Sequence, residues 1–258
     1  MRPSIFFAIL ALSVLTSSCS KLIECEQVSS REAIMLIDVT DPDLFLEIRS
    51  DITANLPVFM QQTGLAEISP CEQFTLTLVP ITSSEGLLAR SETIAITRKG
   101  QSYRTEQQQA NPAPLVNLIR TQLTSFGDMT EDVSVTSGSN IANVILKALT
   151  HSTPGNATTL IIFSDMIENN QYLNMYRHVP DSSEMEHVIK TLIDPIVLEN
   201  FKTRQSEGLE TEVLIVFKEN QLEKVKTSTR DIRSFWSTLM GELGIRNVQF
   251  LDNLSKVN

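Results

Sequence analysis

The sequence predicts one doubly wound α/β domain with a mostly parallel central sheet and helices on both faces. Segments rich in β-branched residues alternate along the chain with segments whose apolar residues recur at helical spacing, which is the order of β–α–β units. Two of the strand segments, 33–39 and 158–165, contain uninterrupted apolar runs, at 33–37 and 160–163, as strands buried on both faces do. With 258 residues and 41% hydrophobic content, the chain can bury a full core without metal or disulfide staples.

The first predicted elements are a strand and a helix joined by an acidic turn. The strand covers 33–39, and the helix begins at Pro42 with Asp41 as its cap. Apolar positions then recur at helical spacing up to Gly64, and we expect Pro57 to kink or shorten this helix.

The remaining elements complete the alternation. Strands at 74–82 and 92–97 are joined by a tight connection, so we expect one antiparallel strand at an edge of the sheet. The others are helices at 114–126 and 139–151, a strand at 158–165, a helix at 182–201 interrupted before Pro195, a strand at 211–218, a helix at 229–244 and an edge strand at 248–251.

The start of the chain is typical of a secretory leader. Arg2 precedes an apolar run from Ile5 to Leu15, which is too short to cross a bilayer, since that takes about 20 residues. Small residues then lead to Cys19, and this stretch resembles the lipobox at which bacterial lipoproteins are cleaved and acylated, although Thr16 stands where that motif prefers Leu.

We therefore predict a signal peptide over 1–18, lipidation of Cys19, a tether over 19–30 and a single domain over 31–258. The protein would be anchored by lipid in the bacterial cell envelope. The alternative is ordinary cleavage near Ser18, which would release a periplasmic or secreted protein.

Two other cysteines, Cys25 and Cys71, precede the first and second strands. Neighbouring parallel strands begin at the same edge of a sheet, so a disulfide between them is one expectation for an exported protein. Two unpaired thiols are the other expectation.

The charge balance excludes one class of partner. The net charge is -10, and no basic cluster occurs along the chain, whereas nucleic-acid binding needs concentrated Lys and Arg. The motifs GxSxG, GxGxxG, HExxH and the P-loop are also missing from the sequence, so we do not predict an enzyme.

Acidic and hydroxyl side chains follow the two buried strands. Asp38 and Thr40 come after the first, Asp165 ends the second, and Ser139 opens the helix between them. Ligands bind at the carboxyl ends of the central strands in doubly wound sheets. We therefore expect these segments to converge at one edge.

These segments resemble the metal-ion-dependent adhesion site of the von Willebrand factor A family. "DVTDP" stands where the family has its DxSxS loop, Ser139 stands where a Thr opens a later helix, and Asp165 where an Asp follows the fourth strand. The resemblance covers about 31–258. It implies a Rossmann-like fold of that type, a protein-binding role, and a divalent cation (Mg²⁺, Mn²⁺ or Ca²⁺) held by Asp38, Thr40, Ser139 and Asp165.

Two positions depart from that pattern. Pro42 replaces the second serine of the first loop, and Met166 stands where a Gly usually follows the last Asp. Mg²⁺ prefers near-ideal octahedral oxygen coordination, so the lost hydroxyl weakens the predicted ion site.

Helix capping is the competing interpretation of the hydroxyl and acidic residues, with Thr40 and Asp41 capping one helix and Ser139 the next. Capping does not account for Asp38 and Asp165, two acids that repel unless a cation or hydrogen-bond donors lie between them. Two hydroxyls that satisfy both acids without a metal are a further alternative.

The predicted function is an envelope-tethered protein-binding or scaffold module. The loop 166–183 follows Asp165 and carries Tyr172, Tyr176 and Arg177, residue types enriched at interface centres, although the loop packing on its own domain is an equal alternative. Two other functions stay open. One is a metal-dependent phosphoesterase that uses the same aspartates, and the other is a metal-free scaffold subunit of an envelope assembly.

Overall fold

The computed structural model describes residues 29–62, 72–82, 92–97, five positions between 117 and 124, 138–153, 155–218 and 227–251. The predicted signal peptide, most of the tether, and Cys19, Cys25 and Cys71 lie outside the described residues, as does most of the predicted helix 114–126.

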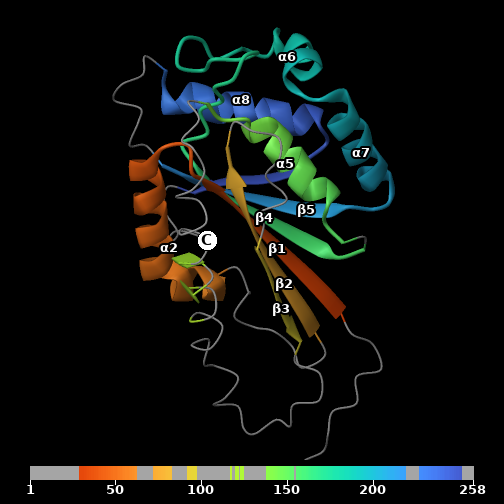
Figure 1. The fold of residues 1–258 in the computed structure, drawn as a ribbon. Helices are drawn as coiled ribbons and strands as arrows, with labels where there is room; N and C mark the ends of the chain where they lie inside the picture. The colour runs from red at the N-terminus through yellow and green to blue at the C-terminus, as the bar shows by residue number, and fades with distance from the viewer. Residues whose placement is uncertain are drawn as a thin grey trace, which may run out of the picture.

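The described strands form a single sheet in the order β3-β2-β1-β4-β5-β6 (Figure 1). Five neighbouring strands are parallel, and β3 pairs antiparallel with β2. The predicted α/β class, a mostly parallel sheet with helices on both faces, is confirmed. The strands are β1 (Ser29–Asp38), β2 (Glu72–Ile81), β3 (Glu92–Thr97), β4 (Ala157–Ser164), β5 (Glu210–Phe217) and β6 (Asn247–Leu251).

The first strand in the sequence lies in the middle of the sheet. Leu36 pairs with Val79 of β2 on one side and with Ile162 of β4 on the other. Both neighbours come later in the chain, and this central position explains why residues 33–37 are all apolar and all buried. The side chain at the end of this strand, Asp38, is therefore carried into the middle of the sheet's carboxyl edge.

Helices cover both faces of the sheet (Figure 1). Alternation along β1 directs Ala33, Met35 and Ile37 toward the core under α2, and Ile34 and Leu36 toward the core under the other helices. The helices are α2 (Pro42–Gln62), α5 (Ile141–Thr150), α6 (Met185–Leu192), α7 (Pro195–Ser206) and α8 (Thr229–Glu242).

Proline has different effects at its two helical positions. The predicted interruption before Pro195 is confirmed, because α6 ends at Leu192 and α7 begins at Pro195. Asp194 caps α7 by accepting hydrogen bonds from the backbone N–H of Ile196 and Val197. At Pro57, in contrast, α2 continues to Gln62, so this proline does not end the helix.

An ion pair between a buried lysine and a partly buried aspartate joins α2 to the end of β5. Lys218 follows β5 and is 8% exposed, and its ammonium lies 2.5 Å from Asp51 Oδ2 and 3.9 Å from Glu47 Oε1. The backbone N–H of Lys218 also donates to the carbonyl of Ser164 at the end of β4 (3.1 Å). The sheet edge is thereby fixed to the helix that covers it.

Within the described residues, none of the helices combines the length and the apolar character that crossing a membrane requires.

Candidate binding site at the carboxyl edge of the sheet

The predicted segments meet at one edge of the sheet. The parallel ladder between β1 and β4 ends on the pair Ile37–Phe163, so Asp38 lies opposite Ser164 and beside Asp165. The start of α5 reaches the same edge, because the backbone N–H of Asn140 donates to the carbonyl of Thr82 at the end of β2 (3.2 Å). Three distant stretches of sequence thus share one site.

Asp38 is 1% exposed and accepts hydrogen bonds at both carboxylate oxygens. Its Oδ1 accepts from the backbone N–H of Thr40 (3.0 Å) and from the Thr40 hydroxyl (2.6 Å), while its Oδ2 accepts from the Ser164 hydroxyl (2.7 Å). Burial raises the pKa of Asp38, and these donors oppose the rise because they favour the ionised form.

Ser164 is a site residue that the sequence prediction missed. Along β4, alternation places Ser164 on the same face as Leu160 and Ile162, and along β1 it places Asp38 on the face of Ile34 and Leu36. The two strands therefore direct Asp38 and Ser164 to the same face of the sheet, where the two residues lie opposite each other. Combining strand parity with strand register would have identified this serine from the sequence.

Asp165 is the second buried acid, with 5% of its surface exposed. Its Oδ1 accepts from the backbone N–H of Ile167 (3.0 Å). Burial, followed by the negative charge of Asp38, raises the pKa of Asp165 to about 7. The two acids are therefore close enough that each disfavours the ionised form of the other.

The predicted caps of the two helices at this edge, Thr40 with Asp41 for α2 and Ser139 for α5, are only partly confirmed. Asp41 caps α2, since its Oδ1 accepts from the backbone N–H of Asp43 (2.8 Å) and Leu44 (3.1 Å). Thr40 does not share this task, because its hydroxyl donates to Asp38. Capping explains Asp41, whereas Thr40 belongs to the acid site.

Ser139 does not cap α5. Its hydroxyl donates to the carbonyl of Ile167 (2.6 Å) and accepts from the backbone N–H of Asn169 (3.1 Å). Ser139 and Asn169 also exchange backbone hydrogen bonds in both directions. Ser139 therefore holds the segment that follows Asp165, and its oxygen is engaged there.

The cap of α5 comes instead from Glu168, which the sequence prediction also missed. Its Oε2 accepts from the backbone N–H of Ala142 (3.0 Å), and its Oε1 accepts from the Asn170 side chain (2.7 Å). Glu168 is fully buried, and burial raises its pKa to about 8 despite these donors. No local sequence signal indicates it, because a side chain two dozen residues downstream fills the capping position.

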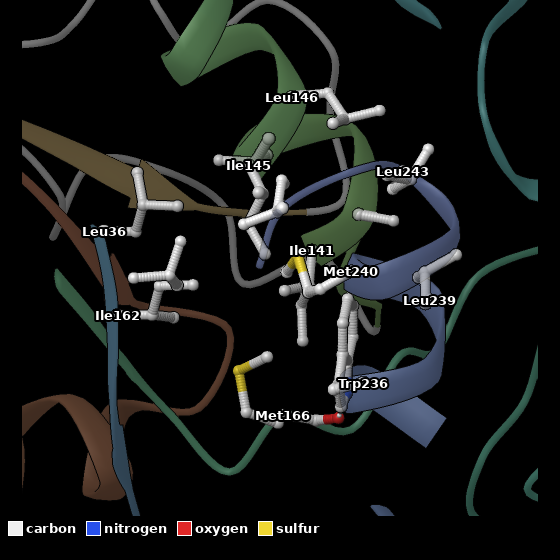
Figure 2. Packing of buried hydrophobic residues seen from close by; sticks show 14 of the residues in the cluster. Leu36, Ile141, Ile145, Leu146, Ile162, Met166, Trp236, Leu239, Met240 and Leu243 are labelled. Atoms are coloured by element: carbon white, nitrogen blue, oxygen red, sulfur yellow. Dashed lines mark hydrogen bonds between the residues drawn. The ribbon is translucent and has the colours of Figure 1, made fainter. Parts of the chain in front are cut away.

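Met166 adopts a left-handed backbone conformation, with a φ of 57°. Non-glycine residues rarely do so, and the cost is about 1 kcal/mol or more. Its N–H is held by the Ser164 hydroxyl (2.9 Å) and its carbonyl by the Trp236 indole N–H (2.7 Å). Figure 2 shows Met166 packed between Ile162 and Trp236 in the core. Burial and these two bonds stabilise a turn that usually needs Gly.

Residues 166–183, here named the rim loop, follow Asp165 and carry exposed aromatic and Arg side chains. Tyr172 is 62% exposed, Tyr176 is 39% exposed and Arg177 is also exposed, while Met175 between them is fully buried. Burial first, then the negative charges of Asp165 and Asp38, raises the pKa of Tyr176 to about 12. Tyr176 therefore lies near the acid pair and keeps its phenolic proton at neutral pH.

The described residues fit the cation site that the resemblance implies only in part. Asp38 and Asp165 supply two neighbouring carboxylates, and Thr40 supplies a hydroxyl beside them. The hydroxyl of Ser139 is committed to the rim loop, and Pro42 offers no oxygen in its side chain. Within the part of the chain that the structure describes, no group of three or more His, Cys, Asp and Glu side chains is arranged to hold a metal ion.

The chain was compared with known proteins at the level of sequence and of structure. No protein-family model and no curated protein matches it. Among solved structures, it is similar to the pilus adhesin SpaC from Lactobacillus rhamnosus GG in its open conformation (13% identity, TM-score 0.45), covering 90% of this chain and 29% of the adhesin. It is also similar to the human COPII-coat protein Sec24c (12% identity, TM-score 0.38), covering 88% of this chain and 30% of that protein. Likenesses this distant assign neither a family nor a function.

Proposed function

We propose that the chain is a protein-binding module of the von Willebrand factor A type, held at the bacterial cell envelope, whose carboxyl sheet edge and rim loop contact a partner protein. One observation carries the proposal. Tyr172, Tyr176 and Arg177 are exposed on a loop whose backbone is anchored to the sheet edge. Exposed aromatic and Arg side chains on a fixed backbone bind with little loss of conformational entropy.

The acids beside the loop favour a basic partner surface. Asp38, Asp41 and Asp165 all raise the pKa of Tyr176, so their charges extend to the rim. A Lys or Arg of the partner would be attracted to this edge and could approach Asp41, which is only half-buried.

The test is photocrosslinking in living cells. A photoreactive phenylalanine derivative in place of Tyr176 should give a covalent adduct with an envelope protein, and Arg177→Ala should reduce its yield. The matched control places the same residue at His151, which is exposed at the C-terminus of α5, at the opposite edge of the sheet. Equal adducts from both positions, or none from Tyr176, would argue against the proposal.

Cation binding at this edge is a separate proposal. Asp38 and Asp165 are two buried carboxylates whose negative charges repel each other, and a bound cation would relieve that repulsion. Mg²⁺ or Mn²⁺ should then raise the melting temperature of the protein, and Asp38→Asn should abolish the shift while Asp181→Asn, at an exposed position, should keep it. With an ion bound, an acidic side chain of the partner would be preferred, and adduct formation at Tyr176 would fall in EDTA. Metal-dependent turnover of a generic phosphoester, lost in Asp38→Asn, would favour the phosphoesterase alternative instead.

A further inference from the structure

A hollow of about 910 Å³ is lined in part by the rim loop, and neither Asp38 nor Asp165 belongs to its lining. Its walls are the turn at 169–172, the start of α5 and the elbow between α6 and α7. This volume lies within the range of small-molecule binding sites and would hold several sugar rings. None of the residues predicted to hold a metal ion lines it.

The lining carries amide groups and almost no available charge. Five of its side chains are amides, namely Asn140, Asn143, Asn169, Asn170 and Gln171.

Its two charged side chains have opposite signs, and both are engaged. Lys190 pairs with Glu186 (2.6 Å), and Asp194 Oδ1 caps α7. The lining therefore carries one positive and one negative charge and no net charge, so it favours neither a cation nor an anion.

The floor of the hollow is fixed by its own hydrogen bonds. Asn143, which is 4% exposed, donates to the carbonyl of Leu192 (2.9 Å) and accepts from the backbone N–H of Asp194 (2.9 Å). Asn143 also donates to Asn140 Oδ1 (2.7 Å). This bond orients the Asn140 side chain so that the N–H groups of Asn140 point away from Asn143. The elbow is thereby joined to α5, and the hollow is formed before any ligand binds.

The lip of the hollow is equally well ordered and carries an exposed ring. Asn170 Oδ1 accepts from the backbone N–H of Tyr172 and Leu173 (2.9 and 3.0 Å), which fixes the turn. The side chains of Gln171 and Tyr172 project from that turn and are exposed. A ring at the lip of a polar hollow offers an apolar surface to a ligand that is otherwise hydrophilic.

From this arrangement we infer that the hollow binds a neutral saccharide. Sugar hydroxyls both donate and accept hydrogen bonds, as amide side chains do, and the C–H face of a pyranose packs on an aromatic ring. Tyr172 would supply the ring, and Asn140 and Gln171 would supply amide contacts. This site goes beyond the proposed protein-binding edge.

A peptide ligand is less well matched. The backbone of Asn169 at this wall is already paired with Ser139 on one side and with Asn174 on the other, so no free strand edge is offered there. The apolar lining residues Leu192 and Ile193 are 2% and 3% exposed, so they form no pocket for an apolar side chain.

The test uses the purified full chain and an immobilised set of neutral oligosaccharides built from hexoses and N-acetylhexosamines, with titration of those retained. At least one should bind, and Tyr172→Ala should weaken that binding by about tenfold, the loss of one stacked ring. Gln171→Ala should weaken it severalfold. The matched control Tyr176→Ala removes another exposed tyrosine, one that does not line the hollow, and should leave the affinity unchanged.

Two results would overturn this inference: retention of no neutral oligosaccharide, or binding that is indifferent to Tyr172→Ala. Both lip residues are exposed, so loss of the fold is not expected in these variants, and circular dichroism would check it. The readout involves no partner protein. Failure of the crosslinking at Tyr176 and failure of saccharide binding would therefore be distinguishable.

Discussion

Replacing Asp165 by Asn tests whether burial and the charge of Asp38 disfavour the ionised form of Asp165 in the folded protein. The substitution preserves the shape of the side chain and an oxygen that can accept from Ile167 N–H, and it removes one charge beside Asp38. We expect it to stabilise the protein at high pH, because an ionised Asp165 is disfavoured by burial and by its neighbour.

The size of the effect follows from the shift in pKa. Folding raises the pKa of Asp165 from 3.8 to about 7, so the folded state binds an extra proton between these values. That contribution favours the folded state at low pH and is lost as the pH rises through about 7. A rise of the pKa from 3.8 to about 7 corresponds to about 4 kcal/mol. Asp165→Asn should therefore raise the free energy of unfolding by about 4 kcal/mol at pH 8 and by less than about 1 kcal/mol at pH 4.

Urea denaturation at both pH values, in buffer with EDTA, would measure the difference. Asp181→Asn is the matched control, because Asp181 is exposed and the Ser183 hydrogen bonds lower its pKa. The control should not gain stability at pH 8. If Asp165→Asn destabilised the protein at pH 8, or had the same effect at pH 4 and pH 8, the ionised form of Asp165 would not be disfavoured in the folded protein.

Three further substitutions test contacts that fix the site. Trp236→Phe removes the indole N–H that holds the Met166 carbonyl and should cost about 1–3 kcal/mol in urea denaturation; an unchanged midpoint would mean that this bond does not stabilise the turn. Lys218→Met leaves the partly buried Asp51 without its cation and should cost about 1–3 kcal/mol, while adding Asp51→Leu should recover most of the loss, and failure to recover would contradict the pairing. Asp41→Ala removes the cap of α2 and should lower the free energy of unfolding by about 1 kcal/mol. An unchanged melting temperature would mean that water caps the helix equally well.

The sequence predicted the sheet well because its signals there are local and strong. Residues 33–37 and 160–163 are short apolar runs typical of strands buried on both faces, and the parallel sheet carries Asp38 and Asp165 to the same edge. The break before Pro195 was equally predictable, since a proline and an Asp cap both act within one helical turn.

The details of the site were not predictable, because they depend on a turn that local propensity disfavours. Met166 has a positive φ that a sequence would be expected to assign to Gly, and this turn carries Glu168 to the start of α5. Once Glu168 occupies the cap, the Ser139 hydroxyl is left for the rim loop. Tertiary packing around Trp236 decides this arrangement, and no short-range pattern encodes it.

The central position of β1 has a consequence for how the chain acquires its structure. Strand β1 is synthesised before both of its neighbours in the sheet, and one of them, β4, lies far along the chain, where Arg31 meets Ala157. Until then a strongly apolar stretch stays unshielded, and contacts so distant in sequence form slowly. A chaperone that binds nascent Ala33–Ile37 would protect it from aggregation over that interval.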